Sequence, residues 1–315
     1  MTLKAPFPYF GGKSRVAPIV WDAFGGVRNY VEPFFGSGAV LLARPDWQPG
    51  MTETVNDMDG YLCNFWRAIQ HDPEQTAHYA DWPVSELDLH ARHKWLIEQR
   101  PIVERLRAEP DYFDVKIAGY WVWGLCAWIG PGWTFADVRQ LPHLGDAGVG
   151  INRRLPYLGD AGRGKYIRDY FAGLSARLRD VRVACGDWRR VLGERVTFKN
   201  GGMHRGGNNL TATFLDPPYA ATNRATVYDH DNASVAHDVA EWCRANENNP
   251  KLRIVLAGYE GDYDLPGWYA LPWKANGGYG SQGNGRGREN AGRERLWFSP
   301  HCIQRQQETQ TALAV

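Results

Sequence analysis

The stretch RNYVEPFFGSGAVLLARP, residues 28–45, predicts the fold class of this chain. Its first part is typical of a short β-strand that runs into a glycine turn, and its second part, from residue 37, is typical of a helix. A second unit follows, because TETVNDMD (52–59) resembles a strand that ends in acids and GYLCNFWRAIQ (60–70) has apolar residues at helical spacing. This alternation indicates an α/β fold, in which helices cover a parallel sheet.

The same alternation returns near the C-terminus. Apolar runs indicate strands at 181–187, 211–219, 252–259 and 295–300, and helical spacing indicates a helix at 234–246. The polar, glycine-rich segment 277–295 is expected to be a mobile loop.

The middle of the chain has a different pattern. Residues 93–107 and 114–130 have helical spacing, and the second segment is hydrophobic nearly all round, which is typical of a buried helix. We therefore expect a discontinuous α/β domain, 1–70 and 181–300, that is interrupted by a mainly helical insertion, 71–180, and followed by a flexible tail, 301–315. The near-repeats LPHLGDAG (141–148) and LPYLGDAG (155–162) receive no role.

Composition limits the class of protein. The 315 residues are 43% hydrophobic and 23% charged, as in an ordinary soluble globular protein. The sequence has no run of 18 apolar residues and no apolar N-terminal segment of a signal peptide, so we expect no membrane contact. The cysteines form no CxxC pair, which argues against zinc and favours a reduced, cytoplasmic setting. They are Cys63, Cys126, Cys185, Cys243 and Cys302.

Charge is distributed unevenly, although the net charge is only +1. Residues 153–190 contain nine Arg and one Lys against four Asp. Together with the arginines of 286–295, they are candidates for contacts with nucleic-acid phosphates. An ordinary solvated helix surface explains the same charges equally well.

The glycine turn carries the first chemical motif. In α/β folds, a strand, a glycine turn and a helix N-terminus bind nucleotide-like ligands. Asp57 ends the next strand, 57 − 36 = 21 residues after Gly36, where such folds place the acid that holds ribose hydroxyls. A structural turn followed by a helix-capping Asp is the alternative interpretation.

DPPY (216–219) carries the second motif, directly after the apolar strand TATFL. Two prolines make this turn rigid and leave backbone carbonyls available to accept hydrogen bonds from an amino group. The aromatic residue that follows is suited to stack on a flat base. A plain proline-rich loop is the alternative.

The string GGKS (11–14) suggests a phosphate-binding loop. That motif needs a glycine five positions before Gly12, and Phe7 stands there instead.

In combination, these motifs resemble the Dam-like DNA adenine N6-methyltransferases. PFPYFGGKSRVAPIV (6–20), VEPFFGSGAVLL (31–42), NDMD (56–59) and DPPY (216–219) are similar to that family's motifs and stand in the family's order. Residues 162–170 and 294–300 also lie where the family has comparable segments. The resemblance implies a doubly wound, Rossmann-like methyltransferase sheet with a target-recognition domain inserted before DPPY.

The resemblance also implies residue roles. S-adenosylmethionine would be bound by a set of motif residues, which are Tyr9, Gly11, Gly12, Lys13, Glu32, Phe34, Gly36, Gly38, Asp57, Asp187 and Asp216. Within this set, Asp57 would hold the ribose and Asp187 would lie near the adenine. The catalytic turn would be Asp216, Pro217, Pro218 and Tyr219. Tyr9 stands where Dam itself carries Trp.

The implied reaction is direct methyl transfer to the amino group of an adenine flipped out of a DNA duplex, without a metal or a covalent intermediate. Three alternatives remain at this stage. They are methylation of cytosine N4, methylation of RNA or a protein amide, and a catalytically silent DNA-binding protein on the same scaffold. The sequence indicates neither the target site nor the oligomeric state, and it does not separate a restriction, phage or regulatory role.

Overall fold

The computed structural model describes residues 3–9, 12–129, 132–136, 141–142, 150–151, 164–199, 210–218, 233–274 and 292–303. Within these ranges the main sheet contains β1 (Asn29–Glu32), β2 (Thr52–Asp57), β5 (Arg182–Cys185), β6 (Thr211–Leu215), β7 (Leu252–Tyr259), β8 (Tyr269–Pro272) and β9 (Glu294–Phe298). A two-residue pairing joins β3 (Trp128–Ile129) to β4 (Gly150–Ile151).

The helices of the described residues are α1 (Ala17–Phe24), α2 (Ala39–Leu42), α3 (Gly60–His71), α4 (Pro73–Ala80), α5 (Glu86–Glu98), α6 (Ile102–Ala108), α7 (Val115–Ala127), α8 (Lys165–Leu178) and α9 (Ala233–Asn246). A short 3₁₀ turn, η1 (Trp188–Val191), follows β5, and a π-helical turn, η2 (Arg195–Lys199), follows it.

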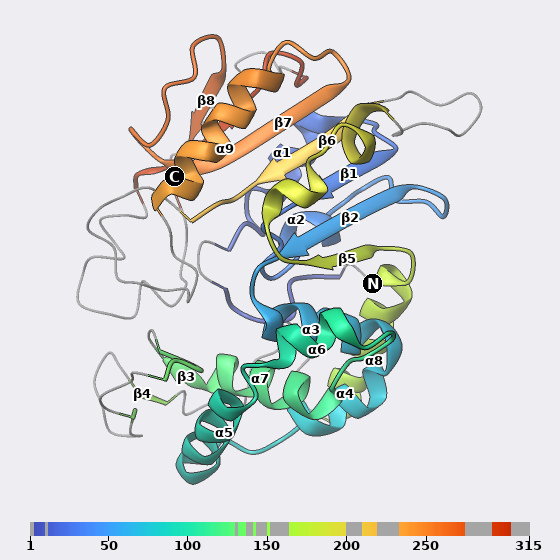
Figure 1. Cartoon of the computed structure of the whole chain (residues 1–315), viewed down its shortest axis with the longest axis vertical. Coiled ribbons are helices and arrows are strands. Elements are labelled where there is room, and N and C mark those ends of the chain that lie inside the picture. The colour runs from blue at the N-terminus through green and yellow to red at the C-terminus, as the bar shows by residue number, and fades with distance from the viewer. Residues whose placement is uncertain are drawn as a thin grey trace.

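The strand order of the main sheet is β5-β2-β1-β6-β7-β9-β8. The first five strands in this order pair in parallel, and β9 pairs antiparallel with both β7 and β8. The chain moves outward from β1 through β2 to β5, and then starts again beside β1 with β6 (Figure 1). The order therefore reverses between β1 and β6, and ligands of open α/β sheets bind outside the carboxyl ends of the strands at such a switch point.

Alternate residues of the strands face the two sides of the sheet and join two hydrophobic clusters. On β1, Tyr30 belongs to one cluster and Val31 to the other. On β6, Phe214 and Leu215 divide in the same way. Helices α1, α2 and α3 contribute to the first cluster, and α9 and η1 contribute to the second. The central strands are thus buried on both faces, as parallel sheets require.

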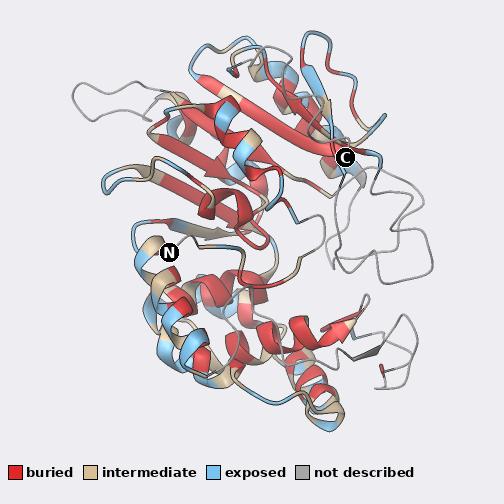
Figure 2. Cartoon of the chain, turned by 180° about the vertical axis from the view of Figure 1, so that it is seen from behind, coloured by how far each residue is buried: buried red, intermediate tan, exposed pale blue. Residues whose placement is uncertain are grey.

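Helices α4 to α8 lie beside the β5 edge of the sheet and pack around α3 (Figures 1 and 2). The first hydrophobic cluster continues into them without interruption, through residues such as Phe65, Trp121 and Phe171. A reciprocal pair of hydrogen bonds locks α3 to the start of α7. Asn64 Nδ2 donates to the carbonyl oxygen of Asp114, and the Asp114 amide donates to Asn64 Oδ1, both at 2.8 Å.

A buried ion network connects α8 to the sheet. Glu53 on β2 accepts from Arg44 Nη1 at 3.0 Å and from Arg177 Nη1 and Nη2 at 2.6 and 2.8 Å. The side chains of Glu53 and Arg44 are 2% and 0% exposed, and that of Arg177 is 10% exposed. Buried charges are stable only when paired in this way.

The structure confirms the α/β sheet and the strands expected at its centre. Residues 93–107 are helical as expected, but they belong to two helices, α5 and α6. Pro101 lies between them and lacks the amide hydrogen that a continuous helix needs. Helices α1, α4 and α8 and strand β8 were not foreseen. Within the described residues, no helix has the length and apolar character of a membrane span.

Several expectations fall outside the described residues. The near-repeats at 141–148 and 155–162 lie almost entirely there, as do most of the glycine-rich segment 277–295 and most of the tail 301–315.

Candidate active site

The glycine turn, Asp57 and the DPPY turn meet at the carboxyl ends of the central strands. The turn PFFGSG follows β1, Asp57 ends β2, and Asp216 follows β6. Because β1 pairs in parallel with both β2 and β6, the carboxyl ends of these strands lie side by side. The sequence motifs therefore converge on the switch point, as the α/β fold requires for a ligand site.

The glycine turn depends on backbone conformations that favour glycine. Gly36 has φ +49° and Gly38 has φ +70°, both in the left-handed region. A Cβ on Gly36 would also lie 2.9 Å from Cδ1 of Tyr9, so the Tyr9 ring packs directly on this turn. Trp66 Nε1, on α3, donates to the Gly36 carbonyl oxygen at 3.1 Å and holds the turn in place.

Asp57 binds the glycine turn from the neighbouring strand. Its Oδ2 accepts from the Gly36 amide at 3.0 Å, and its Oδ1 accepts from the amides of Met58 and Asp59 at 2.8 and 3.1 Å. The following acid, Asp59, is the N-cap of α3 and accepts from the amides of Tyr61 and Leu62. Asp57 is thus brought to the turn as the motif spacing predicts, and Asp59 supplies the helix cap.

Lys13 and Asp216 form an ion pair across the site. The distance from Lys13 Nζ to Asp216 Oδ2 is 2.8 Å, and the two side chains are 4% and 20% exposed. The Lys13 carbonyl accepts the amides of Val16 and Ala17 as α1 begins, so the helix start positions the lysine. The Lys13 ammonium also lies 5.7 Å from the ring centroid of Trp273. The sequence motifs predicted both residues as members of the site, but they did not predict the ion pair between them.

Glu32 is a buried acid beside this pair. Its Oε2 accepts from the hydroxyl of Tyr30 at 2.7 Å, and it is 3% exposed. Burial raises the pKa of Glu32 well above its ordinary value, although the Tyr30 hydrogen bond opposes the shift, and the negative charge of Asp216 raises it further. Glu32 is therefore held toward its neutral form.

Phe34 connects the glycine turn to the segment after β5. Its ring centroid is 6.1 Å from that of Trp188, which follows the predicted residue Asp187. Asp187 caps η1 through the Arg189 amide at 2.8 Å and pairs with the Arg189 side chain at 3.1 Å. Trp188 is buried, and its Nε1 has no hydrogen-bond partner among the described residues. Neither Trp188 nor Trp273 was expected at the site, because nothing in their local sequence separates them from core tryptophans.

The remaining predicted residues are less informative. Pro217 is buried and Pro218 is half-buried, directly after Asp216, while Gly12 closes a turn by donating its amide to the Tyr9 carbonyl at 3.2 Å. Gly11 and Tyr219 lie outside the described residues. Within the described residues, no group of three acids, histidines or cysteines has the arrangement of a metal site.

The arginines of 153–190 that the structure describes make several ion pairs with acids. Arg168 pairs with Asp81 at 3.4 Å, and Arg189 pairs with Asp238 at 2.6 Å. Arg177 belongs to the buried network with Glu53. These three therefore have structural partners, and residues 153–163 of the basic segment lie outside the described residues.

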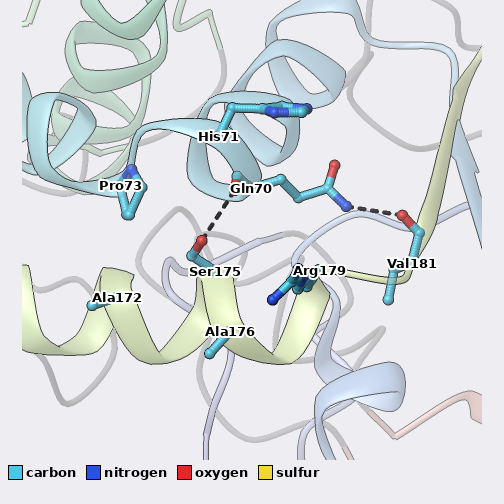
Figure 3. A pocket seen from close by; sticks show the side chains of 8 residues that line it. All are labelled: Gln70, His71, Pro73, Ala172, Ser175, Ala176, Arg179 and Val181. Atoms are coloured by element: carbon cyan, nitrogen blue, oxygen red, sulfur yellow. Dashed lines mark hydrogen bonds between the residues drawn. The ribbon is translucent and has the colours of Figure 1, made fainter. Parts of the chain in front are cut away.

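A groove of about 680 Å³ lies elsewhere, between the end of α3 and α8 (Figure 3). Its polar groups hold the two elements together. Gln70 Nε2 donates to the carbonyls of Leu178 and Val181, and Ser175 Oγ donates to the Gln70 carbonyl. None of the motif residues lines this groove, so it is separate from the site at the switch point.

The comparison with known protein families agrees with the motif geometry. Residues 9–101 match the family model of the D12 class N6 adenine-specific DNA methyltransferases. The match confirms the resemblance to the Dam-like family over residues 9–101, which is less than half of the chain, and that family model describes an enzyme class that methylates adenine in DNA. The matched segment includes Lys13, the glycine turn and Asp57, and it ends before Asp216. No curated protein matches the chain.

Proposed function

We propose that this protein transfers a methyl group from S-adenosylmethionine to the exocyclic amino group of an adenine that has been flipped out of DNA. The observation that carries the proposal is the convergence of the glycine turn, Asp57 and the Lys13–Asp216 pair at the switch point of the sheet. The family match supports adenine methylation, and the residue roles below are our inference.

The residues at the site fit S-adenosylmethionine chemically. The ribose offers hydroxyl donors, for which the Asp57 carboxylate is a suitable acceptor. The sulfonium is a cation, and the half-buried rings of Tyr9 and Phe34 are suited to stabilise it through their faces. When bound, this cofactor supplies an electrophilic methyl group. We assign Asp187 to the adenine end, because it precedes Trp188, which packs near Phe34.

The catalytic work falls on the turn after β6. The adenine amino nitrogen is a weak nucleophile, because its lone pair is delocalised into the ring. Hydrogen bonds from this nitrogen to the Asp216 carboxylate and the Pro217 carbonyl would favour a pyramidal geometry and direct the lone pair at the methyl group. Orientation of this kind contributes roughly 7–11 kcal/mol in favourable cases. We assign Tyr219 to stacking on the flipped base, worth about 1–3 kcal/mol.

Lys13 orients the Asp216 carboxylate in this proposal. The ammonium occupies Oδ2 at 2.8 Å, which leaves the other carboxylate oxygen, Oδ1, for the substrate amino group. The buried start of α1 fixes Lys13, so the carboxylate is held before the base arrives. Preorganised groups of this kind lower the barrier without reorganisation at the moment of reaction.

We propose that residues 71–180 form the target-recognition domain. Helices α4 to α8 gather at the β5 edge of the sheet, away from the central strands (Figure 1). Their core is continuous with that of the sheet, so this region would move with the catalytic domain as one body.

The deciding experiment is methyl transfer from tritiated S-adenosylmethionine to unmethylated duplex DNA, followed by nucleoside mass spectrometry. We expect N6-methyladenine from the wild type and no product from Asp216→Ala, with circular dichroism unchanged. Product from Asp216→Ala at the wild-type rate would refute the mechanism. N4-methylcytosine would refute the substrate assignment, and cofactor binding without any DNA product would favour a silent scaffold.

A further inference from the structure

Two cysteines lie together beside Asp57, and the proposed reaction uses neither. Cys63 is in the first turn of α3, and Cys185 ends β5. Both lie on the α3 side of the sheet, where Cys185 packs against the hydrophobic cluster that contains Cys63. The Cys63 Sγ lies 3.5 Å from the carbonyl oxygen of Asp57 and 3.6 Å from that of Ala184, and the β2–β5 register pairs Asp57 with Cys185. The thiol pair thus adjoins the glycine-turn acid.

The two thiols have different surroundings. Cys63 is 2% exposed, whereas Cys185 is half-buried. The Arg190 Nη1 donates to the Cys185 carbonyl oxygen at 2.8 Å. A Cβ built on the next residue, Gly186, would lie 2.7 Å from this nitrogen and 3.1 Å from Nη2 of Arg107, so two guanidinium groups converge on this point. A partly exposed thiol in positive surroundings is the reactive type.

Cys185 is also the more acidic of the two thiols, in agreement with its more exposed and more positive surroundings. The neighbouring Cys63 thiol lowers the pKa of Cys185, and the positive charge of Arg107 lowers it further, against the opposing effect of burial. The neighbouring Cys185 thiol and burial raise the pKa of Cys63. Burial raises the pKa of the other three cysteine thiols, Cys126, Cys243 and Cys302. Cys185 is therefore the thiol most readily ionised among the five.

We propose that Cys185 and Cys63 form an oxidant-responsive pair, in which Cys185 reacts with a peroxide and Cys63 converts the product to a disulfide. In the first step the Cys185 thiolate attacks one peroxide oxygen, so that an S–O bond forms, the O–O bond breaks and hydroxide leaves. Sulfur is oxidised by two electrons and the peroxide is reduced. In the second step Cys63 loses its proton and attacks the sulfenic sulfur, and the released hydroxide and proton form water. Overall, two thiols and one hydrogen peroxide give one disulfide and two waters.

Oxidation is expected to disturb the cofactor site, and this part of the inference rests on the proposed function. A disulfide holds its sulfurs at about 2.05 Å, far closer than two unbonded thiols can come. The bond therefore links the start of α3 covalently to the end of β5. Asp57 lies between them, because its carbonyl accepts from the Cys63 thiol and from the Gly186 amide at 2.8 Å, while its carboxylate holds Gly36. We expect the affinity for S-adenosylmethionine to fall about tenfold, as for the loss of one hydrogen bond.

The chemical step is tested by peptide mapping of the full-length protein after treatment with hydrogen peroxide and alkylation of free thiols. We expect a Cys63–Cys185 cross-link in the wild type and in the matched control Cys243→Ser. Cys63→Ser should stop at a sulfenic acid on Cys185, which dimedone traps, and Cys63→Ala is the second variant if serine disturbs the fold. Cys185→Ser should give neither product at this position. Absence of both the wild-type cross-link and the Cys185 dimedone adduct would overturn the proposal.

The coupling to the cofactor is tested by titration calorimetry with S-adenosylmethionine on reduced, oxidised and re-reduced protein. We expect weaker binding only in the oxidised sample, with recovery after dithiothreitol and no change in Cys185→Ser. A cross-link without a change in affinity would overturn the coupling. Reduced protein that binds no S-adenosylmethionine would refute the proposed function instead, and the peptide map would still decide the thiol chemistry.

Discussion

The buried network around Glu53 gives the most direct test of the structure. Glu53→Gln preserves the volume of the side chain but removes the negative charge that two guanidinium groups share. The amide nitrogen of Gln is a donor, so at least one of the contacts now made at 2.6–3.0 Å becomes a donor–donor encounter. Arg44, with a side chain that is 0% exposed, has no access to solvent in compensation.

The magnitude follows from this burial. Removal of one partner from a buried ion pair destabilises proteins by about 3–5 kcal/mol, because an uncompensated charge stays in the interior. Arg44 keeps Asp46 at 3.2 Å and the Val27 carbonyl, which places the expected loss toward the lower end of that range. Since Arg177 belongs to α8, the substitution also loosens the helical region from the sheet.

Urea unfolding followed by tryptophan fluorescence measures the change. The matched control is Glu109→Gln, which removes an ion pair with Arg105 that is exposed on both sides and should leave the midpoint nearly unchanged. A loss below about 1 kcal/mol for Glu53→Gln, or equal losses for the two variants, would refute the assignment of a stabilising buried network.

Three further predictions concern the site and the helical region. Lys13→Met should lower kcat at least tenfold with a smaller effect on the Kd for S-adenosylmethionine, because Asp216 loses its orienting partner; equal changes in both constants would contradict that role. Glu32→Gln should leave the melting temperature almost unchanged at neutral pH, since burial already favours the neutral acid, whereas a fall of several degrees would show that the carboxylate is ionised. Burial, together with His90 and Arg100, lowers the pKa of His93 to about 4. Its folded-state pKa is below the unfolded value of about 6.5, so its contribution to stability is complete above about 6.5 and is lost as the pH falls toward 4. His93→Phe should flatten the pH dependence of the urea midpoint in that window, and an unchanged slope would argue against a buried neutral histidine.

The elements predicted from sequence were those whose signal is local. The alternation of strand and helix in 28–70 follows from hydrophobic periodicity, and Asp57 follows from its spacing to the glycine turn. The helical spacing of 93–107 is also local and predicted helical structure there, although it continues across the break at Pro101. Helix α8 was missed because the charged face of its sequence suggested a basic surface, while its apolar residues pack into the core.

Sequence by itself determined the strand–turn–helix units, the acid that ends β2 and the acid that follows β6, because chain connectivity and side-chain periodicity suffice to specify them. Only the tertiary structure decided that Lys13 pairs with Asp216, that Cys63 and Cys185 lie on the same face of the sheet, and that β6 returns to lie beside β1. These contacts join residues far apart in the chain. They form because burying both faces of the sheet fixes the strand order, and no local pattern encodes which distant strand becomes a neighbour.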